Sequence, residues 1–330
     1  MNLKKRDKRL LYEFCMDSRL PYTVLARKSR MSQQLAAYKI KAMRESGLIA
    51  FSYPMIDYSR FGLLQFRVHF RVNYRSKQTF LDLVTKLSKH NDVAEVVERG
   101  GKHDLVVTFA ARNPSAFNKT LRRLIEENHD QLKDYMILTT VVSHYFPKKY
   151  LIGLEDNTRD TVIGGDRGMA EVTNIDKKVL HLLVDDTRAR TVDIAAKVGI
   201  NPRTCIATIK RLKSFEVLRG FSSILDPKES GLLQSIMLIK YQNLSIKDEE
   251  KLRLFCITNK YITEMHKLFG NYDVAITIEA ESAVHLRSVS IQIRERFENI
   301  INDSDDFRVF RTHKRAFLSK SFFADKASRV

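Results

Sequence analysis

The stretch GINPRTCIATIKRL, residues 199–212, predicts a turn and the helix that follows it. Asn201 followed by Pro202 is a strong helix start, because the Asn side chain caps free backbone amides and proline fits the first helical position. A preceding helix is predicted to begin at Thr191 as its N-cap, so residues 198–200, with Gly199, separate the two helices. So short a connection makes the helices cross steeply, which is the geometry of a helix-turn-helix.

A second pattern of the same kind lies near the N-terminus. Its third helix is predicted to begin at Ser32, a good N-cap, after a turn over residues 29–31. In both regions the helices before the turn are marked by apolar residues at helical spacing. These residues are Leu10, Leu11, Phe14, Leu25 and Ala26 in the first region, and Val179, Leu180 and Leu183 in the second.

A constant shift of 169 positions relates the two regions and continues far beyond them. Under this shift, and without a gap, identical residues coincide along the first half of the chain. They are Asp7, Lys8, Leu11, Arg19, Ala26, Lys28, Ile40, Lys41, Asp57, Gly62, Leu63, Gln65, Gly101, Asp104, Thr108 and His144. We infer two copies of one unit, which is a covalent version of a symmetric dimer.

Each predicted helix-turn-helix is followed by a strand, residues 48–56 or 217–225, and then by six further elements. Their order is strand, helix, strand, strand, helix, strand, which is the ferredoxin-like βαββαβ domain. Such a sheet has helices on one face and leaves the other face for a partner, which the second copy can supply. The elements are residues 65–72, 77–89, 93–98, 104–109, 114–131 and 135–144, and residues 235–241, 246–258, 262–267, 273–278, 283–301 and 307–313.

The sequence therefore predicts an α+β fold with two copies of a winged-type helix-turn-helix plus a ferredoxin-like domain, related by a pseudo-two-fold axis. The helix-turn-helix domains are predicted at residues 1–60 and 172–229, and the ferredoxin-like domains at 61–150 and 230–316. Residues 151–171 are predicted to be a linker, because they are rich in Gly, Asp and Thr without a sustained apolar period. Residues 317–330 are predicted to be a tail.

Composition narrows the class of protein. The chain has 330 residues, 44% of them hydrophobic and 29% charged, as in globular proteins. Its net charge of +18 favours polyanionic partners such as nucleic acid or an anionic membrane surface, although a basic proteome or solubility would also explain it. Residues 1–60 alone hold thirteen Lys and Arg against five Asp and Glu.

We expect a cytoplasmic protein without a membrane span. The apolar runs at residues 105–111 and 232–241 are far too short to cross a bilayer, and residues 10–16 do not fit a secretory signal. The three cysteines have no spacing typical of a zinc site or a disulfide framework, which indicates a reducing compartment.

The second copy resembles the Lrp/AsnC family of transcription regulators. Ile175-Asp176 with Leu180 is similar to the family's opening I-D-x-x-I-L, and residues 199–212 are similar to its recognition-helix pattern G-L-S-x-x-x-(small)-x-x-R-(apolar)-x-x-L. The family's glycine turn, G-x-(aromatic or His)-D, is found at residues 101–104 and 270–273. The resemblance covers nearly the whole chain except the linker and the tail. It implies a helix-turn-helix joined to an amino-acid-sensing (RAM) domain.

The first copy departs from the family pattern, because Arg30 stands where the glycine before the recognition helix is usual. The two heads are therefore not equivalent, and we do not expect a perfectly palindromic DNA site. Exposed polar residues near a recognition-helix N-terminus contact bases, whereas basic residues contact phosphates. The predicted DNA-binding residues are Ser32, Gln33, Gln34, Tyr38, Asn201, Arg203, Thr204 and Thr208, with Lys39, Lys41, Lys210 and Arg211 for phosphates.

For each basic residue the alternative is a merely solvated helix face. Five apolar residues of the recognition helices have core spacing and are predicted to be structural: Ile40, Met43, Ile206, Ile209 and Leu212.

The resemblance also implies that an amino acid or related small molecule binds near the glycine turn. Gly101 and Gly270 permit a tight turn, and Asp104 and Asp273 could accept a hydrogen bond from an ammonium group. The alternative is that these residues only shape the turn, and some relatives bind no effector. Weaker effector candidates on the last strands are Thr139, Thr140, Arg311 and Thr312. The partners that we expect are double-stranded DNA, such an effector and further copies of the chain.

We expect no enzymatic activity, metal or cofactor, because the sequence contains no HExxH, GxSxG or P-loop motif. Sirohaem decarboxylases share this architecture as paired or fused halves and are the main alternative. The Arg-rich segment that we would expect to hold tetrapyrrole carboxylates is not found. RNA binding is a further alternative, but no RNP1-like run is present.

Overall fold

The repeat seen in the sequence determines the order of secondary structure in the computed structural model, which describes residues 3–153, 158–243 and 245–324. Every helix and strand of the first copy begins 169 residues before its counterpart in the second copy. The first copy contains α1 (Lys5–Met16), α2 (Tyr22–Ser29), α3 (Gln33–Glu45), β1 (Ile49–Ile56), η1 (Tyr58–Phe61), β2 (Leu64–Val72), α4 (Lys77–Lys89), β3 (Val93–Arg99), β4 (Leu105–Ala111), α5 (Pro114–Glu126) and β5 (Leu132–Tyr145).

The second copy repeats this order. It contains α6 (Asn174–Asp185), α7 (Thr191–Val198), α8 (Pro202–Ser214), β7 (Leu218–Leu225), α9 (Pro227–Ser230), β8 (Leu233–Tyr241), α10 (Ile246–Thr258), β9 (Ile262–Gly270), β10 (Val274–Ala280), α11 (Ala283–Arg296) and β11 (Ile301–Arg315). The α+β fold with two helix-turn-helix plus βαββαβ units is therefore confirmed.

Local chemistry explains the two helix-turn-helix units, which we call head 1 (α1 to β1) and head 2 (α6 to β7). Ser32 accepts a hydrogen bond from the Leu35 amide at the start of α3, and Asn201 accepts one from the Arg203 amide at the start of α8. In the turn before α8, Gly199 has a φ of +77°, which glycine adopts without strain.

The turn of head 1 forms without a glycine, and α7 begins without the predicted cap. Arg30 takes the left-handed conformation that Gly199 takes in head 2, with a φ of +54°, at a cost of about 1 kcal/mol. The missing glycine therefore leaves the turn intact. The prediction that Thr191 caps α7 is wrong: Thr191 is the first helical residue, and Arg190 precedes it without a side-chain cap.

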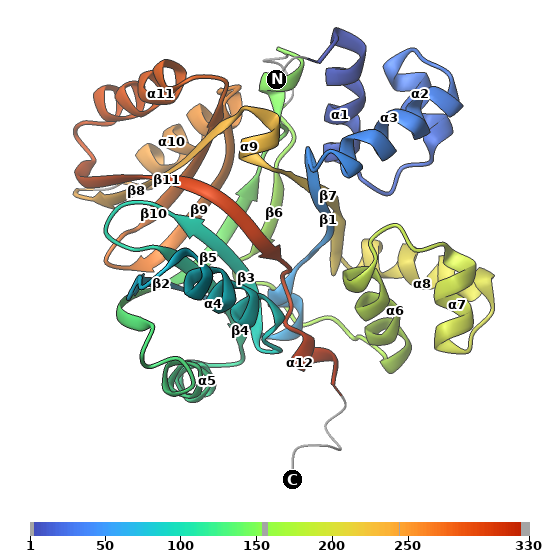
Figure 1. Ribbon diagram of the computed structural model, residues 1–330, viewed down its shortest axis with the longest axis horizontal. Coiled ribbons are helices and arrows are strands. Elements are labelled where there is room, and N and C mark those ends of the chain that lie inside the picture. The colour runs from blue at the N-terminus through green and yellow to red at the C-terminus, as the bar shows by residue number, and fades with distance from the viewer. Residues whose placement is uncertain (1–2, 154–157, 244, 325–330) are drawn as a thin grey trace.

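The two heads are joined by a small antiparallel sheet. Strand β1 pairs with β7, and Tyr53 lies opposite Ser222, its own counterpart under the repeat, which places the pseudo-two-fold axis at this pair. Two reciprocal hydrogen bonds also join the heads. Arg19 Nη1 donates to the Thr187 carbonyl at 2.6 Å, and Arg188 Nη1 donates to the Ser18 carbonyl. Both heads project from the same side of the molecule (Figure 1).

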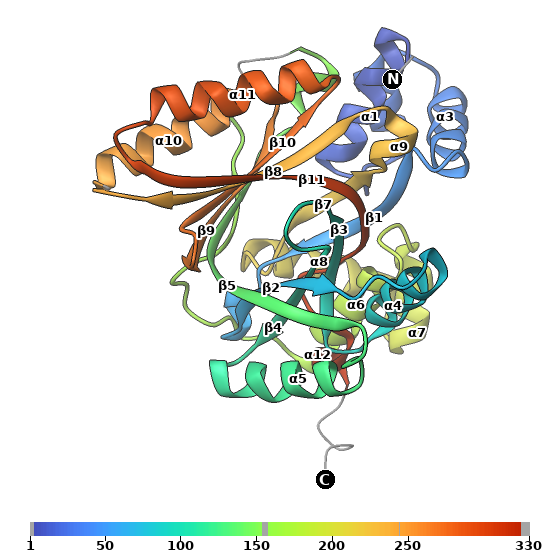
Figure 2. The same ribbon diagram turned by 60° about the vertical axis from the view of Figure 1, so that its left-hand side comes forward.

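The two ferredoxin-like domains form one body rather than two separate sheets facing each other. The strand order is β2-β4-β3-β11-β8-β10-β9-β5, and a β2–β5 pairing closes it into a ring. The last strand of each copy crosses to the other copy, so that β5 pairs with β9 and β11 pairs with β3. Helices α10 and α11 cover one outer side of the body, and α4 and α5 cover the opposite side (Figure 2).

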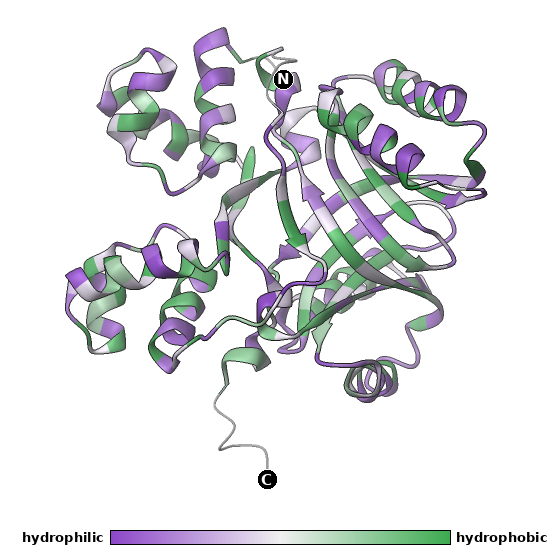
Figure 3. Cartoon of the chain, turned by 180° about the vertical axis from the view of Figure 1, so that it is seen from behind, coloured by the Kyte–Doolittle hydropathy of each residue, from purple (hydrophilic) through white to green (hydrophobic). Residues whose placement is uncertain are grey.

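Apolar residues fill the spaces between these helices and the ring. Phe70, Phe109 and Leu121 lie in the core under α4 and α5, and Leu252 and Ile276 lie in the matching core under α10 and α11. Hydropathy follows this arrangement, because the strands of the body carry many apolar residues and the outer helices show both polar and apolar turns (Figure 3). Inside the ring, a smaller apolar cluster borders several buried charged residues.

Three predicted segments contain more regular structure than the sequence indicated. The linker contains strand β6 (Thr161–Gly164), which pairs with β5, and its Ile163 is completely buried. The described part of the tail contains α12 (Lys320–Phe323), whose Phe323 ring stacks on His181 of α6 at 5.0 Å. Strand β11 begins at Ile301, six residues before its predicted start, because its first half is polar and hides the strand pattern. Residues 325–330 lie outside the described part.

Within the described residues, no helix combines the length and the apolar composition that a membrane crossing requires.

Candidate functional site

The recognition helices α3 and α8 present most of the residues that we predicted for base contacts. Gln33, Gln34, Arg203 and Thr204 are all exposed, and Tyr38 has 69% of its surface exposed. They lie in the N-terminal half of their helices, which is the part that enters the major groove in helix-turn-helix proteins. Ser32 and Asn201 are also exposed, but their side chains already cap the helices.

Two residues of α8 have exchanged the roles that we predicted. Thr208 is 5% exposed and belongs to the inner side of the helix, so it cannot contact a base. Ile206, which we predicted to be structural, is 45% exposed. The position of the N-cap fixes the rotation of α8 about its own axis. Cys205 and Thr208 therefore face the interior of head 2, and Ile206 does not.

Two basic residues predicted for phosphate contacts are ion-paired within their own head. Lys39 Nζ lies 3.0 Å from Asp7 Oδ1, and Arg211 Nη2 lies 2.6 Å from Asp176 Oδ1. Asp7 and Asp176 are repeat partners, and both are buried. In each head a cation of the recognition helix therefore neutralises a buried carboxylate of the first helix, although the two cations occupy different helix positions.

Lys41 and Lys210 remain accessible for phosphate contacts. Both are exposed, and Lys41 makes a long ion pair of 3.7 Å with Glu45 on the same helix. Such a surface pair contributes little to stability, so a phosphate can replace Glu45 as its partner at low cost.

The glycine turns predicted to bind an effector use their aspartates for the fold. Asp104 Oδ2 accepts a hydrogen bond from the Val72 amide at 2.7 Å, and Asp273 Oδ2 accepts one from the Tyr241 amide at 2.8 Å. Asp273 Oδ1 also accepts a hydrogen bond from Lys240 Nζ at 3.1 Å. Both carboxylates thus hold the end of a neighbouring strand, which is the structural alternative considered for them.

The glycines of these turns lie against the last strand of the other copy. A Cβ on Gly270 would lie 3.0 Å from the Ile137 carbonyl oxygen and from Leu138 Cδ2 of β5. A Cβ on Gly101 would lie 3.7 Å from Phe307 Cβ of β11. The turns are therefore part of the interface between the copies.

The four weaker effector candidates do not form one site. Thr140 accepts a hydrogen bond from Arg67 Nε at 3.2 Å, and Thr312 and Arg67 line the same internal cavity of about 20 Å³. Thr139 lies opposite Phe269 in the β5–β9 pairing. Arg311 points elsewhere and pairs with Asp226 at the start of α9, with 3.4 Å between Nε and Oδ2.

Our sequence reasoning missed a buried charged network inside the ring, which we call the body network: Glu95, Glu264, Arg315, His266 and Arg67. Arg315 donates to Glu95 at 2.5 Å and to Glu264, which joins the two copies. His266 Nε2 lies 3.1 Å from Glu264 Oε2, and Arg67 Nη2 lies 3.3 Å from the His266 ring nitrogens. Glu95 and Glu264 coincide under the repeat, and charged residues within apolar strands were the signal that could have revealed them.

Burial and charge shift the pKa values of this network. Burial, with the neighbouring Arg67, lowers the pKa of His266 to about 4. Burial works against the charged form of Glu264, but Arg315 and His266 outweigh it and hold the pKa of this carboxyl below its usual range. The network is thus two arginines and two carboxylates around a neutral histidine. Among the described residues no cluster of His, Cys, Asp and Glu could hold a metal ion.

This fold defines a class of proteins in which helix-turn-helix heads are joined to ferredoxin-like domains, here twice in one chain. The model of the AsnC-type helix-turn-helix domain matches residues 172–213, which implies DNA binding. The HTH-type transcriptional regulator AldR of Mycobacterium tuberculosis is 30% identical over 155 residues, which are 46% of this chain and 82% of that protein. The chain belongs to the Lrp/AsnC family of helix-turn-helix regulators.

Other comparisons agree on the family and on the tandem fold. The leucine-responsive regulatory protein of Rhizobium meliloti is 25% identical over 133 residues, which are 39% of this chain and 84% of that protein. The crystal structure of the sirohaem decarboxylase NirDL covers 97% of this chain and of its own length, with a TM-score of 0.60 and 14% identity. At this identity the likeness concerns the fold, and it includes both copies.

Proposed function

We propose that this protein is a sequence-specific transcriptional regulator that binds DNA as a covalent pseudo-dimer. The observation that carries the proposal is that the β1–β7 sheet and the reciprocal Arg19 and Arg188 contacts join two heads with exposed recognition helices. Two heads at a fixed separation suit two half-sites on one duplex. The three free, buried cysteines support a place in the reducing cytoplasm.

The two heads bind different half-sites in this proposal. Head 1 offers Gln33 and Gln34, whose amides suit adenine, and head 2 offers Arg203, whose guanidinium suits guanine. The exposed Ile206 of head 2 adds an apolar contact that suits a thymine methyl group. A non-palindromic operator follows.

Selection of bound sequences from random duplexes, followed by footprinting, tests this function. We expect two dissimilar half-sites whose centres lie about 10 base pairs apart, or a multiple of that distance. Two identical half-sites would contradict the division between the heads. No sequence preference above the non-specific level would overturn the regulator function itself.

The second candidate function is that of a sirohaem decarboxylase, which the full-length likeness to NirDL favours. Against it, the cavities of about 50 and 20 Å³ that the described residues form between the copies are small, whereas sites for drug-sized ligands measure roughly 300 Å³ or more. Hollows of about 300, 440 and 400 Å³ are lined by residues of the second copy alone. We therefore propose that the chain is not an enzyme. Incubation with sirohaem under reducing conditions, with mass analysis of the tetrapyrrole, tests this: loss of carboxyl groups as CO₂ would establish the enzyme instead.

A further inference from the structure

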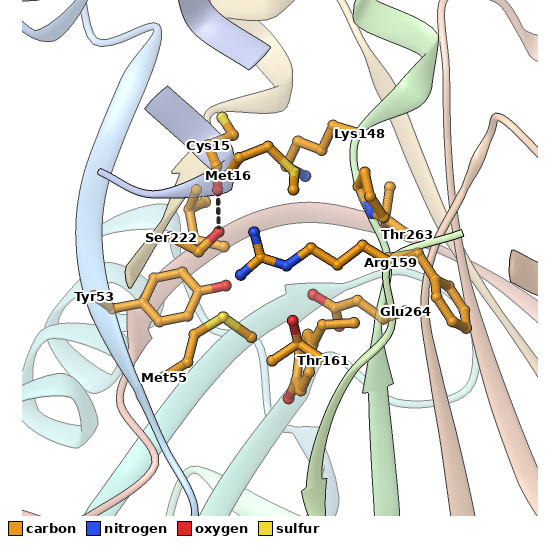
Figure 4. Close-up of a pocket in the computed structure, with 14 residues that line it drawn as sticks. Cys15, Met16, Tyr53, Met55, Lys148, Arg159, Thr161, Ser222, Thr263 and Glu264 are labelled. Atoms are coloured by element: carbon orange, nitrogen blue, oxygen red, sulfur yellow. Dashed lines mark hydrogen bonds between the residues drawn. The ribbon is translucent and has the colours of Figure 1, made fainter. Parts of the chain in front are cut away.

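The two heads meet on one side of the β1–β7 sheet, which we call its outer side. On the other side, Tyr53 of β1 and Ser222 of β7 point toward the body and, with Arg159, line a cavity of about 50 Å³ (Figure 4). Side chains alternate along a strand, so the neighbouring Ser52 and Phe221 lie on the outer side. Residues from both recognition helices reach this outer side.

Four cations gather there in two pairs that the repeat relates. Arg19 coincides with Arg188 under the shift of 169 positions, and Arg44 coincides with Lys213. Arg44 and Lys213 lie near the C-terminal ends of α3 and α8, and both are exposed. Arg19 and Arg188 lie in the loops that join the heads, and both are half-buried. We call these four residues the junction cations.

Two aromatic rings hold the junction cations close together. The Phe14 ring of head 1 carries Arg44 at 5.4 Å and Arg188 at 5.5 Å from its centroid. The Phe221 ring of head 2 carries the other two cations, at 5.3 and 5.7 Å. Each ring thus binds the cation of its own recognition helix and the arginine of the other head. Burial lowers the pKa of Arg188, and the nearby charge of Arg44 adds to this effect.

The positive charge of the junction is only partly balanced. In the part of the chain that the structure describes, no junction cation forms an ion pair with a carboxylate. Asp17 and Asp186 also act on the two arginines, but each accepts a hydrogen bond from a backbone amide of its own loop, at 3.0 and 2.9 Å. Glu45 and Glu216, near the ends of the recognition helices, pair with other cations. Four cations against two carboxylates leave the junction positive, so it favours an anion.

The place of the junction on the pseudo-two-fold axis indicates which anion it meets. This axis passes through the pairing of Tyr53 with Ser222, and the repeat places one pair of junction cations on each side of it. When two recognition helices occupy major grooves one helical turn apart, the minor groove midway between them faces the protein. Phosphates of the two strands form the two edges of that groove. One pair of cations is therefore available to each strand.

We propose that the junction cations form a further DNA-binding surface, which holds the phosphates midway between the two half-sites. Arg44 and Lys213 are exposed and contact the phosphates, one on each strand. Arg19 and Arg188 are positioning residues, because each already donates to a carbonyl group of the other head. The surface rests on the proposed function, since it requires both heads on one duplex. It includes none of the residues that the sequence predicted for DNA binding.

Duplexes with neutral methylphosphonates in place of phosphates test this surface. Their sequence is the one chosen by selection from random duplexes. One duplex carries methylphosphonates midway between the half-sites on both strands, a second carries them at one end beyond both half-sites, and a third carries none. We expect the midpoint substitution to weaken binding of the wild type about tenfold, because the charge that the cations contact is removed. The substitution at the end should leave the affinity unchanged.

A double variant, Arg44→Gln with Lys213→Gln, tests the protein side of the same contact. It should bind the unmodified duplex about tenfold more weakly, and the slope of log affinity against log salt should fall by about two. The midpoint methylphosphonates should have no further effect on it, since the contact is already lost. Lys119→Gln with Arg287→Gln, on α5 and α11, removes the same charge from exposed positions of the body and is the control. It should respond to the midpoint substitution like the wild type.

Two results would overturn the surface while leaving the regulator function intact. The first is specific DNA binding by the wild type that is insensitive to the midpoint methylphosphonates. The second is a double variant, folded by thermal unfolding, that remains as sensitive to them as the wild type. Absence of any sequence preference in the wild type would instead overturn the regulator function and this surface with it.

Discussion

In the proposed regulator, some exposed residues contact bases and others contact phosphates. Arg203 is exposed at the start of α8, while Lys41 is exposed further along α3. Lys39 and Arg211 are also basic residues of the recognition helices. Each of them, however, forms an ion pair with a buried aspartate that would otherwise carry an uncompensated charge. Position relative to the first helix, rather than residue type, separates these two groups of cations.

Replacement of Arg203 and of Lys41 by alanine should therefore have different effects. Arg203→Ala should cost about 1–3 kcal/mol at its own half-site and relax the base preference there, because a bidentate base contact is lost. Lys41→Ala should weaken all sequences alike and lower the slope of log affinity against log salt by about one. Fluorescence anisotropy over a salt series measures both, with Lys119→Ala on α5 as the control. The same pattern for both changes would refute this division.

At the scale of elements, the glycine turns join the two copies rather than present an open binding site. Gly270 ends β9 at the point where this strand pairs with β5, and Leu138 is its direct partner. Its φ of +143° is unfavourable for any residue with a side chain. Glycine at this position is thus required by the contact between strands.

Gly270→Ala should destabilise the protein by about 1–3 kcal/mol. The new methyl group would lie 3.0 Å from the Ile137 carbonyl oxygen, so β5 and β9 must separate slightly. Gly168→Ala is the control, because a Cβ there meets no atom within 4 Å. Urea unfolding of both variants gives the comparison, and equal stability of the two would show that the turn adapts without cost.

For the whole molecule, stability depends on the body network that joins the copies. His266 stays neutral in the folded protein down to about pH 4, whereas in the unfolded chain it takes up a proton near pH 6.5. A lowered histidine pKa means that the unfolded state binds more protons in this interval. The free energy of unfolding must therefore fall as the pH decreases from about 6.5 to 4.

Protonation of His266 alone is expected to lower the free energy of unfolding by about 3 kcal/mol between pH 7 and pH 4. Glu264 and Glu95 add to it below about pH 4.5, because Arg315 keeps both carboxylates ionised in the fold against the effect of burial. Urea unfolding at several pH values measures this dependence. In the His266→Gln variant the decline should begin only where the carboxylates titrate; an unchanged profile would show that other groups set the acid sensitivity.

The sequence by itself was sufficient for the repeat, the helix starts at Ser32 and Asn201, and the βαββαβ order of each copy. These features depend on neighbours a few residues apart, through caps, turns and apolar periodicity. For the same reason it placed Gln33, Gln34 and Arg203 correctly near exposed helix starts.

Tertiary structure alone decided which strands pair across the copies, that Thr208 faces inward and that Lys39 and Arg211 serve the fold. It also brought Arg159 into a cavity with Tyr53 and Ser222. These outcomes depend on contacts between residues far apart in the chain, and β5 meets β9 across more than a hundred residues. Local propensity carries no information about such contacts, because burial and charge pairing are determined only when the copies close on each other.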